Sequence, residues 1–240
     1  MEVDALAVLV AALVAVGLPL LAARSGVPEE KVDEIAEIRT SVYASAALSL
    51  VFFAGAVFLF ALWRDVPAAE LGWRVGTVGG MLAWAVGTTA AGLAVVWALA
   101  VLGRRLGIEE SPVSFALMPR TGRELRGFLL LSGVAAVAEE YLFRGWLQAV
   151  LGVALGSPWP AVALASVSFG VAHGYQRAIG IVRATLLGAL LAQPVVWTGS
   201  LFPAIVAHFW INAVIGAGAW RHLYPDAAAP GTAPTTHEDG

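Results

Sequence analysis

The chain has 240 residues, of which 59% are hydrophobic and 13% are charged, and its formal net charge at pH 7 is −3. This composition is too apolar for a water-soluble domain and indicates an all-α, polytopic helical membrane protein. The small net charge and the lack of a basic patch argue against a nucleic-acid partner. The sequence has no cysteine, which excludes disulfides and thiolate chemistry.

Seven apolar runs follow one another along the chain and predict about seven transmembrane helices, within a range of six to eight. They cover residues 3–23, 42–63, 77–102, 127–151, 161–174, 179–197 and 202–220. The fifth run is short, since a helix needs about 20 apolar residues to cross a bilayer. We expect residues 1–224 to form a single transmembrane domain. The tail, 225–240, is rich in Ala, Pro, Thr and Gly, a composition typical of disorder.

The distribution of Lys and Arg predicts the orientation of these helices. Glu2 and Asp4 precede the first run, which is the reverse of a signal peptide, so we expect that run to be a retained span. With seven spans, the loops on one side carry most of the basic residues outside the runs, whereas the other side carries only Arg64 and Arg74. Because basic loops stay on the cytoplasmic side, the N-terminus is predicted outside and the C-terminus inside. The Ala- and Val-rich spans and the acidic tail suggest a prokaryotic cell membrane.

The fourth run contains three ionisable residues, Glu139, Glu140 and Arg144. Each costs on the order of 2.5–3.5 kcal/mol at the centre of a bilayer, so their presence needs an explanation. Glu140 and Arg144 are four residues apart on one helix face and can form an ion pair. Glu139 points about 100° away, which leaves it free for chemistry. The alternative is a buried ion pair that only packs helices together.

Two later runs also contain polar residues that break the apolar pattern. Phe169 and His173 share one face of the fifth run, and His208 and Asn212 share one face of the last. Polar groups inside a membrane must find partners, and these groups can satisfy one another only by converging. The sequence therefore predicts one shared site. A buried carboxylate can activate water with help from a histidine, while a second histidine and an amide stabilise an oxyanion.

The chemistry that these residues exclude is also informative. There is no Gly-x-Ser-x-Gly elbow and no cysteine, so a covalent nucleophile is not expected. The zinc-protease pattern His-Glu-x-x-His is absent as well. Glu139, His173 and His208 could still hold Zn²⁺ with a water as the fourth ligand, and the residues alone leave that open.

These three motifs resemble those of the CAAX-protease and bacteriocin-processing family of intramembrane endopeptidases, over residues 120–219. The resemblance implies a helical membrane domain with a cavity open to one face, and hydrolysis of a peptide bond by a glutamate-activated water. It implies that Glu139 is the base, helped by His173, and that His208 and Asn212 bind the oxyanion. Glu140, Arg144 and Phe169 would support them. A metal-independent site is favoured over zinc, because Asn212 suits an oxyanion better than a zinc ion.

The resemblance implies as partners the lipid bilayer and a membrane-associated protein or peptide substrate. The substrate could be a prenylated C-terminal peptide, a bacteriocin or a sorting signal. Two other functions stay open: a non-proteolytic scaffold or immunity protein, and a proton-coupled transporter. The runs also place His173 and His208 at different depths, so convergence requires shifted or broken spans, for which Pro194 and Pro203 are candidates.

Overall fold

The structure, a computed structural model, describes residues 1–24 and 31–224, and in that part of the chain it has helices and no strands. The all-α prediction is confirmed, whereas the predicted disordered tail, 225–240, lies outside the described residues. The elements are α1 (Ala5–Ala12), η1 (Leu13–Gly17), α2 (Leu18–Arg24), α3 (Val32–Glu37), α4 (Arg39–Trp63), η3 (Ala68–Leu71), α5 (Val78–Leu106), α6 (Pro112–Ala116), α7 (Gly122–Glu140), η4 (Tyr141–Leu147), α8 (Gln148–Leu155), α9 (Pro158–Ala172), η5 (Gly174–Gln176), α10 (Arg177–Thr198), α11 (Phe202–Val214), η6 (Ile215–Ala219) and α12 (Trp220–Leu223).

All seven predicted runs are helical. Within the described residues, the helices long and apolar enough to cross a membrane are Ala5–Arg24, Arg39–Trp63, Val78–Leu106, Gly174–Thr198 and Phe202–Leu223. The fifth predicted run is the shorter apolar helix α9, and the fourth lies in one continuous helix made of α7, η4 and α8, which carries the glutamates. A polytopic helical membrane protein is therefore confirmed. The number of helices that cross the bilayer and their orientation remain predictions.

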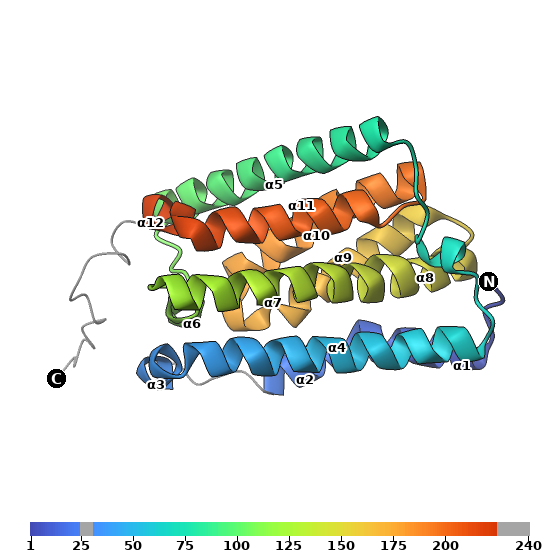
Figure 1. Ribbon diagram of the computed structural model, residues 1–240, viewed down its shortest axis with the longest axis horizontal. Helices are drawn as coiled ribbons and strands as arrows, with labels where there is room; N and C mark the ends of the chain where they lie inside the picture. Colours follow the sequence, from blue (N-terminus) through green and yellow to red (C-terminus); the bar gives the residue numbers. More distant parts are fainter. Residues whose placement is uncertain (25–30, 225–240) are drawn as a thin grey trace.

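The helices form two layers (Figure 1). One layer contains α5, α11, α7 and α4 side by side, and each contacts the next in that order. The second contains α10 and α9, with α9 packed against α10 and against α8, the end of the long α7 helix, and with α1 and α2 beyond. The α7 helix thus lies at the centre of the bundle, where its polar residues are surrounded by other helices.

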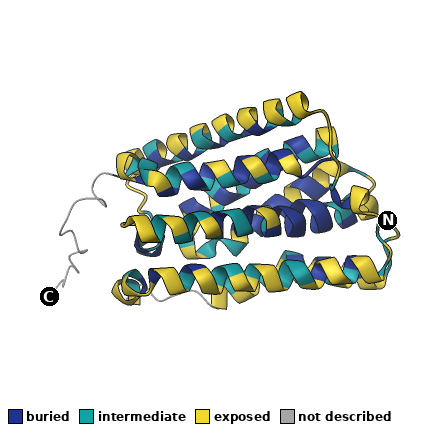
Figure 2. Cartoon of the chain, in the orientation of Figure 1, coloured by how far each residue is buried: buried dark blue, intermediate teal, exposed yellow. Residues whose placement is uncertain are grey.

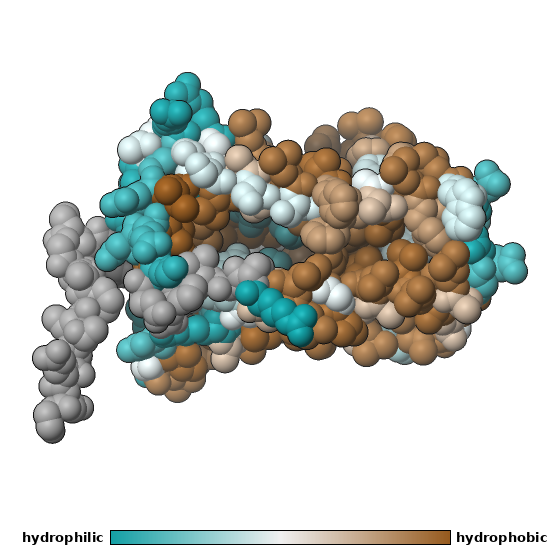
Figure 3. Space-filling view, turned by 90° about the horizontal axis from the view of Figure 1, so that it is seen from below, coloured by the Kyte–Doolittle hydropathy of each residue, from teal (hydrophilic) through white to brown (hydrophobic). Residues whose placement is uncertain are grey.

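The outer helices present apolar side chains to their surroundings. Leu48, Phe52 and Trp63 on α4 and Val86 and Trp97 on α5 are largely exposed. Figure 2 shows exposed residues along α4 and α5 and buried ones concentrated in the central helices. Apolar side chains cover much of the face in Figure 3, with polar residues toward both ends. Since large exposed apolar surfaces are rare in soluble proteins, this surface matches a lipid environment.

The start of α7 is fixed by a capping box. Thr121 accepts a hydrogen bond from the Glu124 backbone N–H, and the Glu124 carboxylate accepts one from the Thr121 backbone N–H. Arg39 at the start of α4 pairs with Glu124 at 2.6 Å and donates to the Ala116 carbonyl. These contacts join α4, α6 and α7 at one end of the bundle, so Glu139 and Glu140 fall near the other end of α7.

Neither Pro194 nor Pro203 breaks or shifts a helix, although both were candidates to do so. The α10 helix continues through Pro194, and Pro203 lies in the first turn of α11, where its missing N–H costs nothing. Two other irregularities of the helices lie next to the candidate site residues. The α9 helix has only 15 residues and ends at Ala172, so His173 is its C-cap, and the π-helical segment η4 begins directly after Glu140. Short π-helical segments inside α-helices are frequent at functional sites.

Candidate active site

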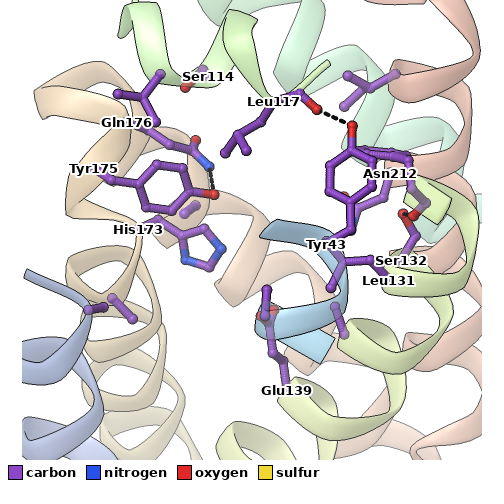
Figure 4. Close-up of a pocket in the computed structure, with 18 of the residues that line it drawn as sticks. Tyr43, Ser114, Leu117, Leu131, Ser132, Glu139, His173, Tyr175, Gln176 and Asn212 are labelled. Carbon is purple, nitrogen blue, oxygen red and sulfur yellow. Dashed lines mark hydrogen bonds between the residues drawn. The ribbon is translucent and has the colours of Figure 1, made fainter. Parts of the chain in front are cut away.

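Four predicted residues from three helices line one cavity of about 900 Å³. Glu139 comes from α7, His173 from the end of α9, and His208 and Asn212 from α11. Figure 4 shows Glu139, His173 and Asn212 on different walls of this cavity. The structure therefore brings together the residues for which the sequence predicted one shared site.

The two adjacent glutamates have different surroundings. The Glu139 side chain lines the cavity and is 15% exposed, whereas the Glu140 side chain is fully buried behind it. Glu140 Oε1 accepts a hydrogen bond from Arg144 Nη1 at 3.1 Å, which is the ion pair expected from their spacing. The same oxygen accepts a second hydrogen bond, at 2.8 Å, from Nδ1 of His208. Glu140 is thus held by two partners, and Glu139 is left facing the cavity.

Arg144 connects this pair to the helices around it. Its Nη2 donates to the Gly188 carbonyl of α10 at 3.1 Å, and its guanidinium lies 4.4 Å from the centre of the Phe169 ring. A Cβ atom at Gly188 would lie 3.2 Å from Nη2, so a glycine leaves room for this contact. Because a buried charge is costly unless paired and hydrogen-bonded, these contacts are what allow Arg144 to be almost fully buried.

His208 lies between the two carboxylates. Its Nδ1 donates to Glu140, so its Nε2 is directed to the cavity side, where it lies 3.7 Å from Oε2 of Glu139. The spacing of residues in the sequence did not indicate the bond between His208 and Glu140. Helical periodicity relates residues within one helix, and the contact joins α7 to α11. The only available signal was that every intramembrane polar group must have a partner.

His173 is oriented by Phe169, four residues earlier. Its Nδ1 lies 2.8 Å from the Phe169 carbonyl, so that nitrogen donates and Nε2 is the ring's acceptor. The imidazole also packs on the Phe169 ring with 4.6 Å between centroids. The Phe169 ring also meets the His208 ring edge to face, with 6.2 Å between the ring centroids. Phe169 therefore contacts both histidines and Arg144.

Asn212 lies one turn after His208 on α11, on the wall that also carries Tyr43 and Ser132 (Figure 4). Within residues 1–24 and 31–224, no hydrogen bond occupies its amide, whereas the hydroxyls of Tyr43 and Ser132 donate to the Leu117 and Phe128 carbonyls. The Asn212 amide is thus available to a bound molecule.

A zinc ion bound by Glu139, His173 and His208 would need these three side chains to converge on one point at roughly 2.0–2.2 Å each. Across the described part of the chain, no three His, Asp or Glu side chains are grouped closely enough to hold a metal ion. Nδ1 of each histidine is bound to a protein acceptor, which leaves Nε2 as the nitrogen that could face a metal or a water. In this arrangement the three side chains are therefore not close enough together to ligate one zinc ion.

Comparison with known proteins identifies relatives of this region. The family model described as "Type II CAAX prenyl endopeptidase Rce1-like" matches residues 121–214, which include every residue of the site. The uncharacterized protein YpbD of Bacillus subtilis (strain 168) is 30% identical over 176 residues, which cover 72% of this chain and 81% of that protein. No solved structure matches the chain significantly.

Proposed function

Because the chain belongs to the CAAX-protease and bacteriocin-processing family, we propose that it is an intramembrane endopeptidase that hydrolyses a peptide bond with a water activated by Glu139. The observation that carries this proposal is the division between the two glutamates. Glu140 is buried and held by Arg144 and His208, while Glu139 faces a cavity lined by His173, His208 and Asn212. A buried ion pair such as that of Glu140 would be enough for a scaffold. A glutamate that faces a cavity, such as Glu139, is needed only for a reaction or a ligand.

The reaction would begin at Glu139. Its carboxylate takes a proton from water, whose oxygen attacks the carbonyl carbon of the peptide bond. The carbonyl oxygen becomes an oxyanion, and the side-chain N–H of Asn212 donates to it. His208 can add a second donor when Nε2 also carries a proton, and Glu140 at Nδ1 supports the positive charge of that ring. When the C–N bond breaks, the proton held by Glu139 passes to the leaving amine.

His173 has a separate part in this scheme. Its Nδ1 is bound to the Phe169 carbonyl, so Nε2 is the nitrogen that can accept a hydrogen bond from the attacking water. Two acceptors, a carboxylate and an imidazole, would then orient the water. Orientation of this kind lowers the barrier by removing the entropic cost of bringing the reactants together.

The shape of the cavity favours a membrane-associated substrate. Its walls include apolar residues of the lipid-exposed helices α2 and α4, such as Leu18, Leu21, Leu50 and Phe53. A hollow is visible on the face shown in Figure 3. An apolar chain or a lipid-modified peptide could bind there without leaving the bilayer. A prenylated peptide, a bacteriocin and a sorting signal would all meet this condition.

A farnesylated CAAX peptide with a quenched fluorophore tests the activity of the purified protein. We expect the wild type to cleave it and Glu139→Gln to abolish cleavage without lowering the unfolding temperature. Glu109→Gln is the matched control, because Glu109 is an exposed glutamate paired only with Arg177 in the described part of the chain. Equal activity in Glu139→Gln and the wild type would show that Glu139 is not the base and would favour the scaffold.

A further inference from the structure

The segment that follows His173 carries polar residues that the proposed reaction does not use. Tyr175 and Gln176 of η5 line the cavity, as do Glu110 and Arg183. We propose that Tyr175 is a substrate-binding residue whose hydroxyl donates a hydrogen bond to an oxygen of the bound peptide. Gln176, Arg183 and Glu110 are positioning residues that direct this hydrogen into the cavity. The proposal rests on the function proposed above and identifies a further determinant of substrate binding.

The direction of each hydrogen bond in this chain follows from the chemistry of its donors. Arg183 can only donate. Its Nη1 donates to Glu110 Oε1 at 2.6 Å, and its Nη2 donates to Gln176 Oε1 at 2.9 Å. The oxygen of the Gln176 amide is therefore fixed on the arginine side, and its Nε2 donates to the Tyr175 hydroxyl at 3.0 Å.

The Tyr175 oxygen is thus an acceptor in its contact with Gln176, and its own hydrogen is available for another partner. Within the described residues, no protein acceptor receives that hydrogen. Figure 4 shows the hydroxyl directed into the cavity, on the same wall as His173. The rings of Tyr175 and His173 lie 6.1 Å apart, so the free donor is next to the proposed site of hydrolysis.

The local sequence explains why η5 reaches this position. Arg177 has φ 61° and ψ −173°, a strained conformation that reverses the chain between η5 and α10. Gly180, in the first turn of α10, lies under Gln176. A Cβ atom at Gly180 would be 2.1 Å from the Gln176 Cβ and 3.0 Å from its Oε1. A glycine is therefore required for Gln176 to fold back over α10 and contact both Arg183 and Tyr175.

The test compares two tyrosines of the same cavity, with the farnesylated CAAX peptide as the probe. Tyr175→Phe removes the free donor, and we expect KM to rise about 2- to 10-fold with kcat and the unfolding temperature unchanged. Tyr43→Phe is the matched control, because the Tyr43 hydroxyl already donates to the Leu117 carbonyl at 2.6 Å. That variant should unfold at a lower temperature but keep the KM of the wild type.

A second variant tests the direction of the hydrogen bond. In Gln176→Glu, one carboxylate oxygen keeps the contact with Arg183 and the other accepts the Tyr175 hydrogen, which turns the donor away from the cavity. KM should rise as much as in Tyr175→Phe, although the hydroxyl is still present. The double variant Tyr175→Phe with Gln176→Glu should then show no further rise, because both changes remove the same donor.

Peptides with a free and with an amidated C-terminus show which oxygen is bound. If Tyr175 binds a backbone carbonyl, Tyr175→Phe raises KM equally for both peptides. If it binds the terminal carboxylate, the rise is larger for the free peptide, since hydrogen bonds to charged groups are stronger. A wild-type KM in Tyr175→Phe, or a loss of kcat together with a lower unfolding temperature, would overturn the proposal. A wild type that cuts neither peptide would instead overturn the proposed endopeptidase activity, and the role of Tyr175 with it.

Discussion

The N-terminal helices and the C-terminal helices of this domain meet different surroundings. Only 11% of the apolar window of α4 is buried inside the protein, compared with 39% in the windows that include α10 and α11. Buried Glu140, Arg144 and His208 all lie in the C-terminal half. Over most of their length the outer helices thus need only to be apolar and long enough, because their neighbour is lipid, with Arg39 at the start of α4 as a polar exception. The inner helices need particular residues at particular positions, because their neighbours are polar groups on other helices.

The difference has a consequence for how each half tolerates substitution. In lipid, any apolar side chain is an adequate replacement for another on α4. In the interior, each partner of a buried charge is hard to replace, since removing it leaves the other charge unpaired. The match to the family model, which covers residues 121–214, falls on this interior half.

The largest effect on stability is expected at Arg144. Arg144→Ala leaves Glu140 fully buried without its cationic partner, and such losses cost about 3–5 kcal/mol. The measurement is the unfolding of the purified protein in detergent. Arg64→Ala is the control in the N-terminal half, because Arg64 pairs with Asp4 at 2.7 Å but both side chains are partly exposed. We expect a change within experimental error there, and similar losses in both variants would contradict the proposed difference.

The next effect is on the reaction and not on stability. Asn212→Ala should lower kcat by about 10²–10³, the usual loss when one donor to an oxyanion is removed. Its unfolding should be unchanged, because no described residue depends on the Asn212 amide for a hydrogen bond. Ser132→Ala is the control from the same wall, since its hydroxyl already donates to the Phe128 carbonyl at 2.8 Å. A kcat reduced equally in both variants would point to a change in the shape of the cavity.

The same contrast explains what the sequence could predict. The lipid-facing helices were predictable because hydropathy and length determine them, and all seven apolar runs are helical. The ion pair between Glu140 and Arg144 was predictable because it lies within one helix. The gathering of Glu139, His173, His208 and Asn212 followed from the need of buried polar groups for partners.

Other features of the site had no signal in the sequence. The contact of His208 with Glu140 joins two helices whose register depends on the whole bundle. The π-helical segment η4 and the strained Arg177 are local departures that no residue type in the sequence indicates. Pro194 was predicted as a candidate for a break, yet α10 is continuous through it. Tertiary packing decides each of these cases.

A smaller effect is expected at the capping box of α7. Burial would raise the pKa of Glu124, but hydrogen bonds from the backbone of Arg120 and Thr121 and the charge of Arg39 lower it below its ordinary value of 4.5. Glu124 therefore stabilises the fold above about pH 4.5, and this contribution is lost as the pH falls through the lower value in the folded state. Thr121→Ala should cost about 1 kcal/mol at neutral pH.

The pH dependence of this effect has its own control. Glu124→Gln should be less stable than the wild type at neutral pH, and the difference should disappear in acid, where the wild-type carboxylate is protonated. Unfolding temperatures measured from pH 7 to pH 3 would show the two curves meeting. Parallel curves would mean that Glu124 stabilises the protein by packing and not by its charge.

The smallest effect is expected from chelation. Treatment with 1,10-phenanthroline should leave cleavage almost unchanged, because no three-ligand group forms among the described residues and Asn212 suits an oxyanion better than a zinc ion. If zinc were the electrophile, Asn212 would lie outside the metal's ligands, and its removal would have a smaller effect than the loss predicted above. A large loss of kcat in Asn212→Ala and insensitivity to the chelator should therefore occur together. Stoichiometric zinc in the active protein, with activity lost on chelation and restored by zinc, would mean that the side chains rearrange around a metal and that the glutamate-only mechanism is wrong.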